Sequence, residues 1–244
     1  MERPTMATDT DLKELRVAVT GGTSGLGMAL VRRLIGRGAQ VAFVARNAEA
    51  VERIGTETGG YGIVGDIGRK EDIYPIALQI TGNLGGLVLI NNASALGPTP
   101  LALLADTECE ELEHAFRVNL LGPFRLTKAL FGALATSARN GRGAAVINIS
   151  SDAAVNPYLR WGAYGATKAA LRHLTAIWAE EAKADGISFL SLDPGDMDTP
   201  LHALAVPDAD RTTLKRPQDA AAEIVDALYG TLQDPINLRV AQRQ

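Results

Sequence analysis

Short apolar runs alternate with segments of helical spacing along almost the whole chain. The clear runs are rich in Val, Ile, Leu and Ala, as is typical of strands that are buried on both faces of a parallel sheet. They lie at 15–19, 40–45, 61–64, 86–91, 144–149 and 187–192, and a weaker candidate lies at 236–240. Because helical segments separate consecutive runs, the pattern predicts an α/β fold, a doubly wound parallel sheet covered by helices on both faces.

The chain has 244 residues, of which 46% are hydrophobic, and this is enough for one sizeable core. No repeat, low-complexity tract or linker divides it, so we expect a flexible N-terminal tail over 1–14 and a single domain over 15–244. The longest stretch without a clear pattern is 194–216. Irregular segments of that length in a compact domain usually serve a site, so we expect a functional loop there.

Composition and charge exclude several classes of protein. A net charge of -4 offers no basic surface for nucleic acid, and no run reaches the ~18 apolar residues of a membrane span. The polar first twelve residues lack the apolar core of a secretory signal, and the single Cys109 can form no intrachain disulfide. We therefore expect a cytoplasmic protein whose partner is a small molecule, without nucleic-acid or membrane partners. The three histidines have no metal-ligand partners at suitable spacing, so no metal is expected.

A glycine-rich loop joins the first strand to the first helix. The strand at 15–19 is followed by Thr20-Gly21-Gly22-Thr23-Ser24-Gly25-Leu26-Gly27, and helical spacing begins at Met28. In this context, glycines allow a tight turn and the close approach of a pyrophosphate to the helix N-terminus. The order of strand, glycine loop and helix therefore predicts a dinucleotide site.

Tyr164 and Lys168 stand four residues apart, which on a helix places a phenol and an ammonium on one face. A nearby cation favours the phenolate, so we expect the Tyr164 pKa to fall from its ordinary ~10 toward working pH. Such a Tyr can exchange a proton with a substrate oxygen. The alternative is a solvent-facing Lys beside a half-buried Tyr, and the glycine loop in its proper place favours the catalytic interpretation.

Four motifs follow different predicted strands, at Gly21, Asn92, Ser151 and Pro194. Ligands of open α/β sheets bind beyond the carboxyl ends of the strands, so we expect these residues to meet in one crevice.

With these motifs, the chain resembles the short-chain dehydrogenase/reductase family over about 17–240. The resemblance implies a Rossmann-type fold with about seven strands, a nicotinamide cofactor and a Ser-Tyr-Lys centre assisted by Asn. The implied catalytic residues are Asn119, Ser151, Tyr164 and Lys168. The implied cofactor-binding residues are Gly21, Thr23, Ser24, Gly25, Leu26, Gly27, Asp66, Ile67, Asn92, Tyr164, Lys168, Pro194, Gly195 and Thr199. Ser94 stands where the family usually has Gly, and the Asp-Gly-Gly often found after its last strand is missing.

Two serines adjoin at the end of the fifth strand. Neighbouring residues there face opposite ways, so only one of Ser150 and Ser151 should face the crevice. The thirteen-residue spacing to Tyr164 matches the family for Ser151, which we expect to polarise the substrate oxygen.

Cofactor choice depends on the end of the second strand. An NAD site places a carboxylate there for the ribose 2′-hydroxyl, whereas this chain has Val44-Ala45-Arg46-Asn47. Arg46 can bind a 2′-phosphate through its forked donors, so we expect NADP(H) rather than NAD(H). The alternative is an ordinary exposed arginine.

Pro123 lies in a segment of helical spacing and has no N–H to donate to the carbonyl of Asn119. We hypothesise that the freed carbonyl supports a proton relay from Tyr164 through the ribose and Lys168 to a water. The alternative, to which we give equal weight, is that Pro123 only bends the helix to follow the curvature of the sheet and has no part in proton transfer.

The sequence thus predicts an oxidoreductase that interconverts a carbonyl compound and an alcohol by hydride transfer, with Tyr164 as general acid and base. Two alternatives on the same fold are a catalytically silent nucleotide-binding sensor or scaffold, and a lyase or dehalogenase. The intact Ser151, Tyr164 and Lys168 oppose the first, and the intact glycine loop opposes the second. The resemblance implies a homodimer or homotetramer. Trp161 and Tyr158 are candidates for the substrate pocket or for packing, a surface role is favoured for His202, and Asp196 and Asp198 are left open between helix capping and substrate binding.

Overall fold

The computed structural model describes residues 12–85 and 87–233. Within them lies a six-stranded sheet with strand order β3-β2-β1-β4-β5-β6, and every neighbouring pair of strands is parallel. The strands are β1 (Arg16–Thr20), β2 (Gln40–Ala45), β3 (Tyr61–Val64), β4 (Val88–Asn91), β5 (Ala145–Ile149) and β6 (Ser188–Leu192). This topology confirms the predicted doubly wound α/β fold. The weaker strand candidate at 236–240 lies outside the described residues.

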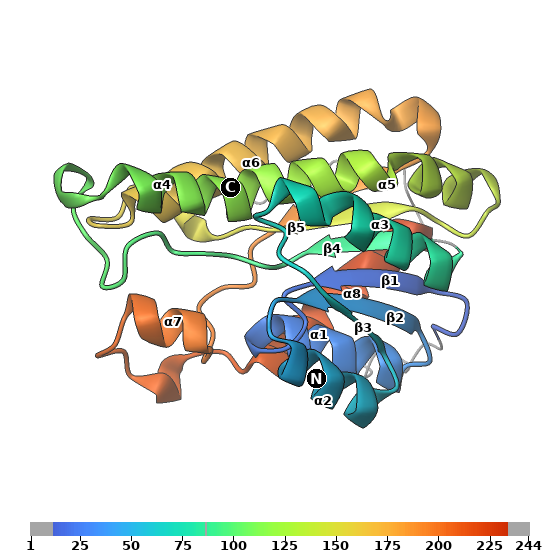
Figure 1. Cartoon of the computed structure of the whole chain (residues 1–244), viewed down its shortest axis with the longest axis horizontal. Coiled ribbons are helices and arrows are strands. Elements are labelled where there is room, and N and C mark those ends of the chain that lie inside the picture. The colour runs from blue at the N-terminus through green and yellow to red at the C-terminus, as the bar shows by residue number, and fades with distance from the viewer. Residues whose placement is uncertain (1–11, 86, 234–244) are drawn as a thin grey trace, which may run out of the picture.

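Helices cover both faces of the sheet (Figure 1). One face packs against α1 (Gly25–Gly36), α2 (Ala48–Thr58) and α8 (Pro217–Gln233). The other packs against α3 (Lys70–Leu84) and α5 (Gly122–Arg139), with α4 (Cys109–Phe116) and α6 (Gly162–Glu181) alongside. Val17 and Val19 point into the first core and Ala18 into the second, and all three are fully buried. Burial on both sides explains why these strands read as continuous apolar runs.

The packed part of the chain begins earlier than the expected tail over 1–14 allows. Leu12 is buried in the first core, and its N–H donates to the Arg37 carbonyl at 2.8 Å. Residues 1–11 lie outside the described residues.

The segment expected to be irregular, 194–216, is partly helical. It contains α7 (Pro200–Ala205) and a 3-10 turn at Arg211–Thr213. The Asp198 carboxylate receives two hydrogen bonds from Arg211, at 2.8 and 3.0 Å, which ties the two ends of the segment together. Thr199 rather than an aspartate caps α7, because its Oγ1 accepts from the His202 N–H at 3.2 Å. In Figure 1 this segment stands at the side of the molecule where the strands end.

A π-helical turn at Arg117–Leu121 joins α4 to α5, directly before Gly122 and Pro123. Short 3-10 turns lie at Leu104–Asp106, Asp152–Ala154 and Lys183–Asp185. None of the described helices combines the length and the hydropathy needed to cross a membrane.

Candidate active site

A cleft of about 1030 Å³ runs along the carboxyl ends of the strands. Residues that follow all six strands line it, from Arg46 at one end to α7 at the other. The cofactor-binding residues expected from the sequence all line this cleft, namely Gly21, Thr23, Ser24, Gly25, Leu26, Gly27, Arg46, Asp66, Ile67, Asn92, Tyr164, Lys168, Pro194, Gly195 and Thr199. Of the expected catalytic residues, Ser151, Tyr164 and Lys168 line it too, whereas Asn119 is not among the lining residues.

The glycine loop brings main chain very close to main chain. A Cβ on Gly27 would lie 2.0 Å from the Gly21 carbonyl oxygen, so no larger residue fits there. Gly21 and Gly25 have φ of 71° and 48°, in the left-handed region that favours glycine. No side chain caps α1 at its N-terminus and its first turn holds no acidic residue, so its N–H groups are suited to an anion. These features fit a pyrophosphate.

Asn92 fastens this loop to the neighbouring strand. Its Nδ2 donates to the Thr20 carbonyl at 2.8 Å, and the Thr20 Oγ1 accepts from the Asn92 N–H at 3.0 Å. The ends of β1 and β4, where the strand order changes direction, are thereby fixed to one another, as a nucleotide-binding crevice at a switch point requires.

The expected adenosine end of the cleft carries Arg46 and Asp66. Arg46 is exposed, and no described acidic residue forms an ion pair with it. Asp66 has one oxygen engaged, since its Oδ1 accepts from the Gly68 N–H at 2.8 Å. Asn47 uses its side chain to cap α2, accepting from the Ala50 N–H at 2.7 Å.

At the other end, α6 presents Tyr164 and Lys168 to the end of β5. Both are buried, and the Lys168 Nζ donates to the Ile149 carbonyl at 2.8 Å and lies 5.4 Å from the centre of the Tyr164 ring. Burial raises the Tyr164 pKa to about 12, against the opposing effect of hydrogen bonds with Ser151 and Ser94. Burial also lowers the Lys168 pKa to about 8.

The expected acidification of Tyr164 is therefore not present in this structure. A fully solvated Lys168 ammonium would lower the pKa of Tyr164, but both groups are buried here, and the loss of water favours the neutral form of each. The phenol is protonated at neutral pH, which suits it to donate a proton.

Both adjacent serines line the cleft, but they differ in surroundings. Ser150 is buried, and its N–H donates to the Leu192 carbonyl at 2.7 Å. The Ser151 Oγ donates to the Asp152 Oδ1 at 3.2 Å and accepts from the Ala153 N–H at 3.2 Å, and Ser151 is close enough to the Tyr164 phenol to lower the pKa of that group. The structure thus brings Ser151 to the phenol.

Asn119 lies in the π-helical turn, behind the cleft wall, and joins three segments. Its Oδ1 accepts from the Ala95 N–H at 2.8 Å and from the Ser94 Oγ at 3.1 Å. Its Nδ2 donates to the Ala95 carbonyl at 2.7 Å and to the Thr167 Oγ1 at 2.9 Å. This amide therefore holds the segment after β4 against α6, next to Tyr164.

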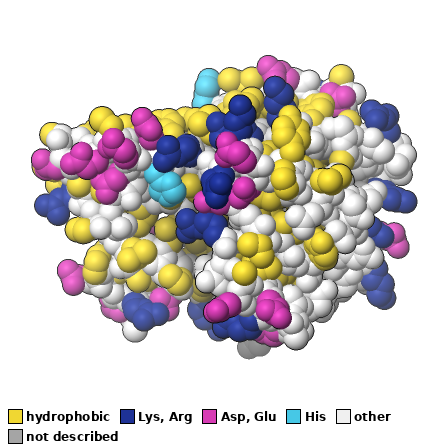
Figure 2. Space-filling model, in the orientation of Figure 1, with side chains coloured by type: hydrophobic (Ala, Val, Ile, Leu, Met, Phe, Trp, Pro, Cys, Tyr) yellow, Lys and Arg dark blue, Asp and Glu magenta, His cyan; other side chains and the backbone are white. Residues whose placement is uncertain are grey.

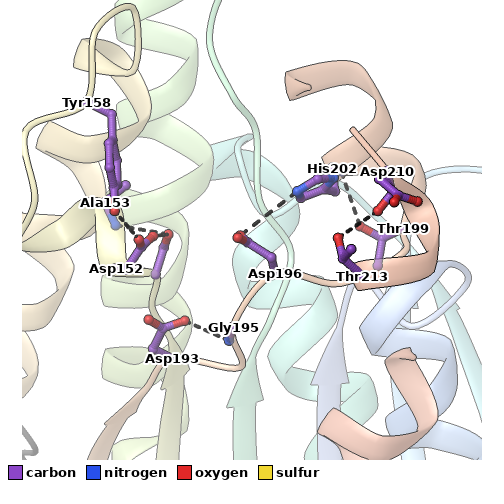
Figure 3. Close-up of polar contacts among 11 residues, drawn as sticks. Asp152, Ala153, Tyr158, Asp193, Gly195, Asp196, Thr199, His202, Asp210 and Thr213 are labelled. Carbon is purple, nitrogen blue, oxygen red and sulfur yellow. Dashed lines mark hydrogen bonds and ion pairs between the residues drawn. The ribbon is translucent and has the colours of Figure 1, made fainter. Parts of the chain in front are cut away.

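Figure 3 shows a group of carboxylates on the segments that follow β5 and β6. Asp193 and Asp152 face one another, Asp196 lies beyond them toward α7, and all three line the cleft. The Tyr158 hydroxyl donates to Asp152 at 2.5 Å, and the His202 Nε2 lies 3.9 Å from the Asp196 Oδ1. The surface role favoured for His202 is wrong, because only 14% of its side chain is exposed and it lines the cleft.

Sequence reasoning missed Ser94, Asp152 and Asp193 as residues of the site. Ser94 could have been noted from its place where the family usually has Gly, and Asp152 and Asp193 each adjoin a motif that had been identified. Trp161, which the sequence left between pocket and packing, lines the cleft, whereas Tyr158 does not. In the described parts of the chain, no group of three or more His, Cys, Asp or Glu side chains could hold a metal ion.

Comparison with known proteins agrees with this geometry. The family model for short chain dehydrogenases matches residues 16–210. The chain is 34% identical to a 3-dehydrosphinganine reductase of Arabidopsis thaliana over 78% of its own length, and it spans 57% of that plant protein.

Two solved structures show the same fold. A 3-ketoacyl-(acyl-carrier-protein) reductase from Brucella melitensis, complexed with NADH, has a TM-score of 0.81 at 25% identity, with 88% of this chain and 91% of that chain covered. A short chain dehydrogenase from Escherichia coli CFT073, complexed with NADPH, has a TM-score of 0.79 at 26% identity, with 93% of both chains covered. The chain therefore belongs to the short-chain dehydrogenase family, as an NAD(P)-dependent oxidoreductase.

Proposed function

We propose that this protein reduces a carbonyl compound to an alcohol with NADPH, and that Tyr164 gives the proton to the carbonyl oxygen. The observation that carries the proposal is a buried phenol, protonated at neutral pH, that lines the same cleft as Ser151 and the glycine loop. Two relatives of this chain are named as reductases, which agrees with that direction. The same groups can run the reaction backward once Tyr164 has lost its proton.

Each residue has a separate task in this scheme. The cofactor supplies the hydride when bound, the glycine loop and the α1 N-terminus hold its pyrophosphate, and Asp66 its adenine side. Ser151 donates a hydrogen bond to the substrate oxygen as negative charge develops there. Lys168 binds the ribose hydroxyls, and Asn119 is a positioning residue that keeps the segment after β4 in place beside Tyr164.

The preference for NADP over NAD is proposed from the end of β2. Arg46 is exposed, lines the cleft and has no described acidic partner, so its guanidinium is available for a 2′-phosphate. No carboxylate stands beside it in Val44-Ala45-Arg46-Asn47 to accept a 2′-hydroxyl. We also propose, from the sequence expectations, a cytoplasmic homodimer or homotetramer.

The decisive experiment measures the rate of NADPH oxidation in the presence of a panel of ketones and aldehydes. It compares the wild type with Tyr164→Phe and Tyr74→Phe. Removal of a general acid should lower kcat/KM by about 10²–10⁴-fold, so Tyr164→Phe should lose that much while it still binds NADPH. Tyr74 is 74% exposed on α3, and its substitution should change nothing. Binding of NADPH without oxidation by any carbonyl compound would instead favour the silent sensor or scaffold.

A further inference from the structure

The substrate end of the cleft has an apolar wall. Leu96 comes from the segment after β4, Trp161 from the start of α6, and Leu201, Leu204 and Ala205 from α7. Apart from Leu204, these side chains form one cluster together with Tyr164. The Trp161 ring meets the Tyr164 ring edge to face, with centres 5.6 Å apart, so the apolar wall begins at the phenol itself.

This wall continues to the mouth of the cleft. Leu204 is 56% exposed and still lines the cleft, so an apolar group at the reacting end could extend along α7 and remain in contact. Figure 2 shows hydrophobic side chains gathered over the segment that carries α7. An apolar ligand that covered them would gain the free energy of removing both surfaces from water.

The same end of the cleft also carries negative charge. Asp152, Asp193 and Asp196 line it, and the charge of Asp193 acts on both Tyr164 and Lys168. Within the described part of the chain, Lys168 and Arg46 are the only Lys or Arg side chains that line the cleft. Arg46 lies at the far end, and the Lys168 ammonium is buried against the Ile149 carbonyl.

Two cations of the segment that follows β6 are already paired. Lys215 forms an ion pair with Glu223 at 2.7 Å, and Arg211 forms one with Asp198 at 2.8 Å. A substrate carboxylate or phosphate beside the reacting carbonyl would therefore meet like charge, and among the described residues Lys168 is the one Lys or Arg that lines this end of the cleft.

We propose that the substrate is an apolar carbonyl compound without negative charge, whose apolar body lies along Leu96, Trp161, Leu201 and Leu204. This inference rests on the proposed reductase function. The reacting carbonyl would lie between Ser151 and Tyr164, at the inner end of this wall. The carboxylates of Asp152, Asp193 and Asp196 act as a filter against anionic carbonyl compounds.

The apolar wall is tested with methyl ketones of increasing chain length, from butanone to decanone. Each added CH₂ that is buried should raise kcat/KM roughly two- to fourfold, since full burial gives about 0.8 kcal/mol per CH₂. Leu204→Ser should flatten this dependence for the longer ketones. The matched control is Leu78→Ser, because Leu78 is also an exposed helical leucine but lies on α3, away from the cleft. A flat dependence in the wild type would overturn the apolar part of the proposal.

The charge filter is tested with pairs of oxo acids and their methyl esters, which share the carbonyl and the chain. The ester should exceed the acid in kcat/KM by at least tenfold at low salt, and the ratio should shrink as salt screens the carboxylates. Asp193→Asn should reduce the ratio several-fold, whatever it does to the absolute rates. An acid that is reduced as well as its ester would overturn the proposal while the reductase function stands.

The two levels of failure can be told apart. If some carbonyl compounds are reduced but neither chain length nor charge matters, the substrate class is wrong and the function is right. If none of the ketones, acids or esters is reduced, although NADPH binds, the proposed function fails and the substrate class fails with it.

Discussion

At the scale of single residues, burial decides the chemistry of the Tyr164 and Lys168 pair more than their proximity does. The i,i+4 spacing places both groups on one helix face, as the sequence predicted. It could not predict that α6 packs both of them out of water, because that depends on residues distant in sequence, such as Leu96 and Ile149. Desolvation then favours the neutral form of each group.

Arg46 offers a residue-scale test of cofactor preference. In Arg46→Asp, the guanidinium that we propose binds the 2′-phosphate is replaced by a group of the same charge as that phosphate, so the Kd for NADPH should rise at least tenfold, given the ~1.5–3 kcal/mol of a charge-assisted hydrogen bond. The Kd for NADH should change much less. Both constants can be measured by fluorescence titration.

The matched control for this change is Arg53→Asp, on the exposed face of α2, which alters the net charge equally outside the cleft. It should leave both dissociation constants nearly unchanged. If Arg46→Asp weakens NADPH and NADH to the same extent, Arg46 is an ordinary exposed arginine and the proposed preference is wrong.

At the scale of elements, the sequence predicted the strands well, but it predicted the points at which the helices are interrupted only in part. Each of the six apolar runs within the described residues became a strand within one or two residues, because burial on both faces leaves a continuous signal. Pro123 signalled a break in the helix, but not that the preceding turn would widen into the π form that holds Asn119. The six-residue α7 lies in a segment that we expected to be irregular, because its short length gives no periodicity, and Thr199 and Pro200 form its cap and first position.

The π-helical turn gives an element-scale prediction. Pro123→Ala restores an N–H to residue 123, which allows the turn to tighten to α geometry and to carry Asn119 away from Ala95 and Thr167. We expect kcat to fall about tenfold, while far-UV circular dichroism shows the fold retained. The proton-relay hypothesis adds that the pH dependence of kcat should also change.

Pro75→Ala is the matched control, because Pro75 also lies in a helix but is exposed on α3. It should leave both kcat and its pH dependence as they are. If Pro123→Ala behaves in the same way, Pro123 merely follows the curvature of the sheet.

At the scale of the whole molecule, the site exists because the topology brings six strand ends to one edge. Gly21, Asn92, Ser151 and Pro194 are far apart in sequence, and the structure brings all four to a single cleft. The sequence predicted this convergence because parallel strands end at the same edge. It could not predict the apolar wall, which depends on how α7 folds over that edge.

Stability as a function of pH tests the burial of Lys168 in the intact molecule. The Lys168 pKa falls from its ordinary 10.5 to about 8 on folding. Below pH 8 both states hold the proton, and between about pH 8 and 10.5 the unfolded chain holds a proton that the folded protein lacks. Stability therefore rises with pH across this window, by roughly 3 kcal/mol in all.

The measurement is the free energy of unfolding in urea, from pH 7 to 10, for the wild type and Lys168→Met. The difference in the free energy of unfolding, wild type minus variant, should rise with pH by up to ~3 kcal/mol. The contribution of Tyr164 ionisation cancels in this difference, because both proteins contain Tyr164. The control is Lys128→Met on α5, where the exposed ammonium stays in water in both states and the difference should remain level. A level difference for Lys168→Met as well would mean that its ammonium keeps its water in the folded protein, and that burial does not lower the pKa of Lys168.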